Sequence, residues 1–151
     1  MRLPKAWFVR GVFTACVCAA AAACDEKLSD LTGPTPNLEP TFASVQSLII
    51  SQPDSAGRTA CVACHTNVGR NPSGGLNMAG DALSALVNVP SRQQAGEILI
   101  VPGDPANSYL IKKLKGIGIT GRRMPFNGPP YLTEGQILVI ERWIQLGARN
   151  N

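Results

Sequence analysis

The sequence predicts an all-α fold of about four helices joined by long loops, in a chain of 151 residues. Apolar residues recur every three or four positions in several segments, which is the spacing of helices that bury one face. Capping residues, glycines and prolines bound these segments. We find no internal repeat and no alternation of strand and helix patterns of the kind that builds a parallel sheet. The length fits one domain.

The first expected helix starts after Thr41 and stops before Pro53. A long loop with four glycines follows over 66–80, and a short helix is expected over 81–88, ended by Pro90. The apolar face of the first helix consists of Phe42, Val45, Leu48 and Ile49.

Two later helices have clearer end signals. Asp104 can cap a helix that has Pro105 at its first position and Gly116 after its end. Thr133 and Gln136 have the spacing of a capping box, which predicts a last helix running to about residue 146.

Residues 1–23 have the features of a secretory leader: basic residues, then an uncharged apolar run from Gly11 to Ala23 that is too short to span a bilayer. The sequence Ala-Ala-Ala-Cys before Asp25 resembles the lipobox of bacterial lipoproteins. We therefore expect a lipoprotein signal peptide at 1–23 and a lipid anchor on Cys24. Ordinary cleavage after an alanine, which would give a soluble periplasmic protein, is the alternative.

The segment 24–40 is polar and contains three prolines, so we expect a flexible, lipid-anchored linker leading to one domain over 41–151. Removal of the leader leaves eleven basic and ten acidic residues, so the formal charge falls from +4 to +1. This near-neutral balance excludes a strongly basic nucleic-acid-binding protein.

The candidate site is Cys61-Val62-Ala63-Cys64-His65, a C-x-x-C-H motif of the kind that attaches c-type haem. On one helical turn, two thiols at i and i+3 and an imidazole at i+4 share a face. The thiols can add to the two vinyl groups of one porphyrin while the imidazole coordinates its iron. His65 is the only histidine in the chain.

Three alternatives explain less of this motif. A structural zinc site needs four ligands, and no second cysteine pair accompanies the motif. A thioredoxin-like dithiol needs a strand–helix–strand setting, which the sequence lacks. A disulfide between Cys61 and Cys64 leaves His65 unexplained. We therefore expect one covalent haem c, with Cys61 and Cys64 attached to the porphyrin and His65 on the iron.

The second axial ligand cannot be another histidine of this chain, and methionine is the other common choice in cytochromes c. After the leader the chain has two methionines, Met78 and Met124. Prolines around Met124 stiffen an extended loop that can cross the opposite haem face. We therefore expect Met124 as the ligand. Met78, or a vacant or exchangeable position, is the alternative.

Four sequence blocks between about Ser51 and Ala148 together resemble class I c-type cytochromes, and most closely the short envelope domains called planctomycete-type cytochrome c domains. The blocks are CVACH, GGLNM, VPGDPANSYLIKKLKG and RRMPFNGPPYLTEGQILVIERWIQLGA. The resemblance implies a cytochrome c-like haem domain in which Cys61 and Cys64 hold the haem, His65 is the proximal ligand and Met124 the distal one.

The resemblance also implies an electron carrier rather than an enzyme, held by its lipid on the periplasmic side of the cell envelope and exchanging electrons with redox partner proteins. The rival interpretation is a haem-based sensor or peroxidase-like subunit whose sixth iron position is open or labile. Basic residues of the third helix and the loop after it form either a docking patch for an acidic partner or a solvated face: Lys112, Lys113, Lys115, Arg122 and Arg123.

Overall fold

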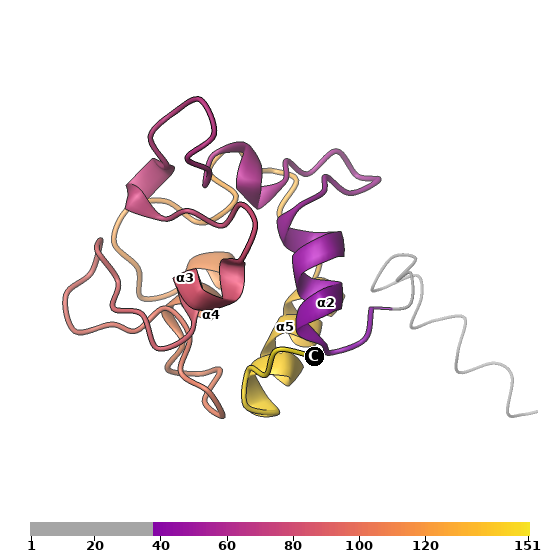
Figure 1. Ribbon diagram of the computed structural model, residues 1–151, viewed down its shortest axis with the longest axis vertical. Helices are drawn as coiled ribbons and strands as arrows, with labels where there is room; N and C mark the ends of the chain where they lie inside the picture. Colours follow the sequence, from indigo (N-terminus) through magenta and orange to yellow (C-terminus); the bar gives the residue numbers. More distant parts are fainter. Residues whose placement is uncertain (1–37) are drawn as a thin grey trace, which may run out of the picture. The chain divides into compact units, whose positions relative to one another are not determined.

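The computed structural model describes residues 38–151, whose course is shown in Figure 1. Helices and turns make up the regular structure of this part of the chain, and isolated bridges take the place of strands. The predicted all-α class is therefore confirmed for 38–151. No helix within this range is long and apolar enough to cross a membrane. The predicted signal peptide, Cys24 and the linker up to residue 37 lie outside the described residues.

The first predicted helix is present, but most of it is wound more widely than an α-helix. It begins as α2 (Phe42–Ser44) and continues as a π-helical segment, η1 (Val45–Ile50). The Thr41 hydroxyl caps it by accepting a backbone N–H three residues later, at 3.2 Å. The wider π-helical turn shifts the buried face, so Ile50 is 3% exposed while Leu48, predicted to be buried, is 37% exposed.

The next helix, α3 (Ala82–Leu86), lies within the predicted segment 81–88. The Asp81 carboxylate caps it by accepting two backbone N–H groups of its first turn. It ends at Val87, which takes an extended conformation and forms a bridge with Ile100. Ile100 is fully buried at this bridge, whereas its neighbours Leu99 and Val101 are only partly buried.

The third helix, α4 (Tyr109–Lys115), begins later than predicted. Asp104 does not cap it and Pro105 is not its first residue; both belong to the preceding turn, and Ser108 occupies the N-cap position. The predicted end is confirmed, because Gly116 follows the helix in the left-handed conformation with φ of 74°.

Tertiary contacts explain the late start of α4. The Ser108 hydroxyl donates to the carbonyl of Asp104 at 2.8 Å and accepts the N–H of Val101 at 2.9 Å, which closes the turn between them. The N–H of Tyr109 donates to the carbonyl of Ile98 at 2.9 Å. The carbonyl of Ile98 thus satisfies the first N–H of the helix, which would otherwise need a capping side chain such as Asp104.

The last helix, α5 (Glu134–Gln145), has the predicted capping box. Thr133 Oγ1 accepts the N–H of Gln136 at 3.2 Å, and Gln136 Oε1 accepts the N–H of Thr133 at 3.0 Å. The α5 helix packs beside α2, where the rings of Phe42 and Trp143 lie 5.6 Å apart (Figure 1). The buried residues of α5 are Ile137, Ile140, Trp143 and Ile144.

A buried ion pair connects the end of the first helix to the start of α5. Arg58 is fully buried, and its Nε lies 3.1 Å from Asp54 Oδ2. Its other nitrogens donate to the carbonyls of Gln52 and Thr59, each at 3.1 Å. Gln136 donates to the same Asp54 oxygen at 3.4 Å. Each side-chain nitrogen of Arg58 therefore has a hydrogen-bond acceptor, and these bonds hold the segment 52–59 that leads to Cys61.

The pKa of Asp54 makes this ion pair sensitive to acid. Burial by itself raises the pKa, but the N–H and charge of Arg58 and the amide of Gln136 outweigh it and hold the pKa of the carboxyl below its usual range. The stabilisation is full above the unfolded-state pKa of about 3.9 and is lost as the pH falls through the lower folded-state pKa.

We predict that Asp54→Asn lowers the free energy of unfolding by about 3 kcal/mol at pH 7, because it leaves the Arg58 charge buried and unpaired. Urea unfolding at pH 7 and at pH 3 measures the effect, and the difference from wild type shrinks at pH 3. Glu141→Gln is the matched control: its exposed ion pair with Lys115 contributes less than about 1 kcal/mol. Equal losses from the two variants at pH 7 would contradict this role of Asp54.

Candidate functional site

The C-x-x-C-H motif forms one tight turn in the structure. A single 3₁₀ turn, η2 (Cys61–Ala63), is followed by a bond from the N–H of His65 to the carbonyl of Cys61 at 2.9 Å. The turn is shorter than the helix expected from the spacing. Cys61 and Cys64 are free thiols, with Cys61 partly buried and Cys64 exposed.

The Cys61 thiol lies against the first helix. Its Sγ is 3.7 Å from the carbonyl oxygen of Ile49, and the side chain packs against the hydrophobic core. Burial raises the pKa of the Cys61 thiol, and the nearby Arg58 charge offsets only part of this effect. Cys61 is therefore a protonated, partly enclosed thiol at neutral pH, whereas Cys64 faces solvent.

The His65 ring is oriented by a backbone carbonyl. Its Nδ1 lies 3.0 Å from the carbonyl oxygen of Ser73. A carbonyl only accepts, so Nδ1 carries the proton and the Nε2 lone pair is left for a metal. Burial, helped by the charge of Lys113, lowers the pKa of His65 and so favours the neutral imidazole. This arrangement is the usual one for a metal-binding histidine whose second nitrogen is held by the protein.

The glycine-rich loop after the motif folds back onto it. The N–H of Ser73 donates to the carbonyl of Cys64 at 3.0 Å, and the N–H of Met78 donates to the carbonyl of His65 at 2.9 Å. Gly75 adopts a φ of 68°, and a Cβ there would lie 2.7 Å from the Arg92 guanidinium. The loop thus requires glycine and holds Ser73 in place for His65.

The two candidate methionines lie in different surroundings. Met78 is 4% exposed and belongs to the hydrophobic core, which is the ordinary role of a methionine. Met124 is partly buried at the edge of that core, on the loop between α4 and α5. These positions favour Met124 over Met78 as the residue available to a cofactor.

The loop that carries Met124 reaches the motif. Asn127 Nδ2 donates to Thr59 Oγ1 at 2.7 Å, and Thr59 lies two residues before Cys61. Asn127 and Thr59 are 68 positions apart in the sequence, so this contact exists only because the proline-rich loop folds against the segment before the motif. The sequence blocks around Cys61 and around Met124 are thus brought together.

Most of the basic residues considered for partner docking already have partners. Lys112 lies 2.8 Å from Glu97, and Lys115 lies 2.7 Å from Glu141. Lys113 is buried. The guanidinium groups of the loop are stacked on rings, Arg122 at 4.7 Å from the Phe126 centroid and Arg123 at 4.1 Å from that of Tyr131. These contacts favour the solvated-face interpretation for Lys112 and Lys115.

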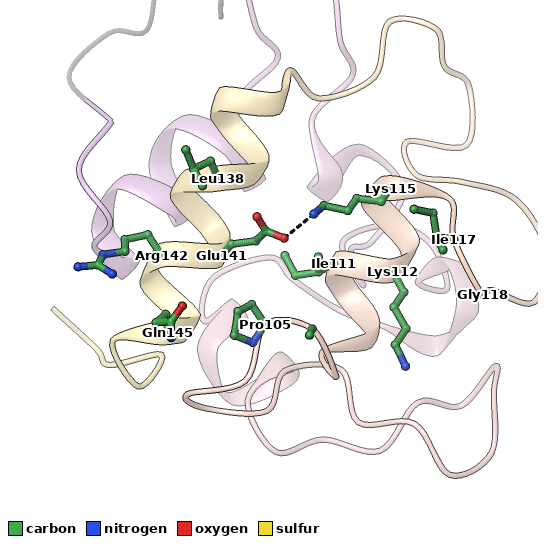
Figure 2. Close-up of a pocket in the computed structure, with 11 residues that line it drawn as sticks. Pro105, Ile111, Lys112, Lys115, Ile117, Gly118, Leu138, Glu141, Arg142 and Gln145 are labelled. Carbon is green, nitrogen blue, oxygen red and sulfur yellow. Dashed lines mark ion pairs between the residues drawn. The ribbon is translucent and has the colours of Figure 1, made fainter.

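A groove of about 570 Å³ lies between α4 and α5 and is crossed by the ion pair of Lys115 and Glu141 (Figure 2). Its lining is mainly apolar and includes Ile111 and Leu138, but none of the four predicted haem-site residues. Within residues 38–151, no three side chains of Cys, His, Asp or Glu are grouped so that they could hold a metal ion. The described part of the chain therefore contains no complete structural zinc site.

Three residues that support the site were not recognised in the sequence. Arg58 and Lys113 are buried cations, and their sequence neighbours give no sign of burial, since charged residues are usually exposed. Ser73 acts through its backbone carbonyl, for which its side chain gives no signal. The glycine pair after Ser73 was the only indication that this loop is tightly folded.

Comparison of the chain with protein-family models, with curated proteins and with solved structures gives no match.

Proposed function

We propose that the chain is a monohaem c-type cytochrome with a cytochrome c-like domain, which transfers electrons in the bacterial cell envelope. The observation that carries the proposal is the turn from Cys61 to His65, in which two free thiols accompany an imidazole fixed by Ser73 with its Nε2 lone pair available. A disulfide would leave the imidazole unused, and within residues 38–151 no three side chains of Cys, His, Asp or Glu are grouped to hold a zinc ion. Covalent haem attachment uses all of them.

The residues of the turn have separate roles in holding the haem. Cys61 and Cys64 would hold the haem through thioether bonds, each formed by adding the sulfur to one carbon of a vinyl group and its hydrogen to the other, so that no oxidant is consumed. His65 would hold the iron through Nε2, while Nδ1 keeps its proton and donates it to the carbonyl of Ser73. When bound, the haem supplies an iron that accepts one electron from a donor and passes it to an acceptor.

Met124 is the proposed distal ligand. Its loop contacts the segment before the motif through Asn127 and Thr59, and its own N–H is bonded to the carbonyl of Lys113 at 2.9 Å. A ligand on a held loop can stay bound in both oxidation states, which suits electron transfer better than the binding of an external molecule. A thioether ligand also raises the reduction potential relative to a second imidazole.

The proposed location follows from the leader and the haem together. Covalent haem attachment in bacteria takes place outside the cytoplasmic membrane, and the sequence 1–23 has the features of an export signal. Lipid on Cys24 would keep the domain at the membrane surface, while the polar linker would let it reach redox partner proteins.

Covalent attachment is tested by expressing the chain in a bacterium with an intact haem-attachment system. We predict that wild type retains its haem after denaturation in acid acetone, and that its alkaline pyridine spectrum is that of two thioether bonds. Cys61→Ser or Cys64→Ser shifts this spectrum toward that of a single bond, and the double variant retains no haem. A wild-type protein that releases its haem on denaturation would contradict the proposal.

The distal ligand is tested with Met124→Ala in the haem-loaded protein. We predict that this variant loses the sulfur-to-iron charge-transfer band of the ferric form, binds carbon monoxide readily when ferrous and has a lower reduction potential. Met78→Leu is the matched control, because it keeps the core volume at a buried methionine and leaves the band unchanged.

A wild-type protein that lacks the band and binds carbon monoxide as readily as Met124→Ala would favour the rival function, a haem-based sensor or peroxidase-like subunit with an open sixth position.

The membrane anchor is tested by growing cells with labelled palmitate. We predict that the wild-type precursor incorporates the label and fractionates with membranes, whereas Cys24→Ser does neither, because the acylated sulfur is gone. Labelling of the Cys24→Ser precursor, or of neither protein, would contradict lipidation at this residue and favour the soluble periplasmic alternative.

A further inference from the structure

The ammonium group of Lys113 is buried under the loop that carries Met124. The residue is 7% exposed, although lysine is among the residue types least often buried. Its Nζ donates to the carbonyl of Arg122 at 2.7 Å, to Gln93 Oε1 at 3.0 Å and to the carbonyl of Thr120 at 3.1 Å. These bonds match the three N–H groups of an ammonium ion.

The acceptors of Lys113 are all neutral, which distinguishes it from its neighbours. Lys112 and Lys115 on the same helix each face a carboxylate, within 2.8 Å and 2.7 Å respectively. No ion pair of Lys113 occurs among the described residues. Its positive charge is therefore solvated by amide oxygens and is not cancelled locally.

The backbone of Lys113 holds the same loop from a second point. Its carbonyl accepts the N–H of Met124 at 2.9 Å. Lys113 thus holds the loop between Thr120 and Met124 through two of its groups. The ammonium binds the carbonyls of Thr120 and Arg122, and the backbone carbonyl binds the N–H of Met124. Arg123 adds a further bond, from its Nε to the carbonyl of Leu114 at 2.6 Å.

We propose that Lys113 is the positioning residue for the distal methionine, and that its uncancelled charge favours ferrous over ferric iron. This inference rests on the proposed haem function. Without the ammonium, the carbonyls of Thr120 and Arg122 lose their donor, and only the backbone bond of Met124 and the side-chain bond of Arg123 still hold the loop to α4. We expect Met124 to be held less firmly as a result. The iron centre gains one positive charge on oxidation, so a buried cation nearby opposes that step.

The charge of Lys113 lies beside the proposed distal ligand, because its Nζ is bonded to the carbonyl of Arg122, two residues before Met124.

The experiment uses the haem-loaded protein with Lys113→Gln and Lys113→Arg, and Lys112→Gln and Lys115→Gln as matched controls. We expect Lys113→Gln to weaken the charge-transfer band, to speed amide hydrogen exchange at Met124 and to raise ferrous affinity for carbon monoxide at least about tenfold. The equilibrium constant for reduction falls about tenfold, which corresponds to a reduction potential lower by about 59 mV. Lys113→Arg, which keeps the charge and the donors, retains most of the wild-type behaviour.

Other results would overturn the inference in distinguishable ways. If wild type shows the band but Lys113→Gln changes the band, the exchange rate and the potential no more than the control variants do, Lys113 has no positioning role. If wild type lacks the band, the proposed distal ligation has failed, and the inference fails with it. If Lys113→Gln does not fold, Gln93→Leu removes one acceptor: a weakened band there supports the inference, and an unchanged band and potential overturn it.

Discussion

The buried ion pair of Arg58 and Asp54 is the interaction on which the arrangement of the candidate site depends. Arg58 is fully buried and bonds to the carbonyls on both sides of its loop, including that of Thr59. Thr59 in turn receives the amide of Asn127 from the Met124 loop, and Asp54 receives the amide of Gln136 from the start of α5. The entry to the C-x-x-C-H turn and the start of the last helix are therefore bonded to the charged pair itself, and the loop that carries Met124 is joined to it through Thr59.

Both proposed iron ligands lie outside the helices and are held by hydrogen bonds to backbone carbonyls. His65 is oriented by the Ser73 carbonyl, and the N–H of Met124 is held by the Lys113 carbonyl. The helix before Met124 has only seven residues, and the motif itself is one 3₁₀ turn. These hydrogen bonds fix the ring of His65 and the backbone of Met124, which would limit the movement of the two proposed ligands between oxidation states.

The sequence predicted those features that depend on neighbouring residues alone. The capping box of Thr133 and Gln136 is such a local pattern, and it was predicted correctly. The turn at Cys61 is another, although it is a 3₁₀ turn and not the predicted turn of helix. The prediction that Leu48 is buried was wrong, because the segment is wound as a π-helix, which turns a different set of side chains toward the core. The spacing of apolar residues does not indicate this winding. The burial of Lys113 could not be predicted either, since its acceptors come from loops folded against it from both sides of the sequence.

Iron K-edge X-ray absorption of the haem-loaded protein, recorded in the ferric and ferrous states, tests the central claim most directly. The account predicts one sulfur and five nitrogen neighbours around the iron in both states, since His65 and Met124 stay bound while the electron moves. Loss of the sulfur neighbour in either state, or a coordination shell made only of nitrogen and oxygen, would contradict it.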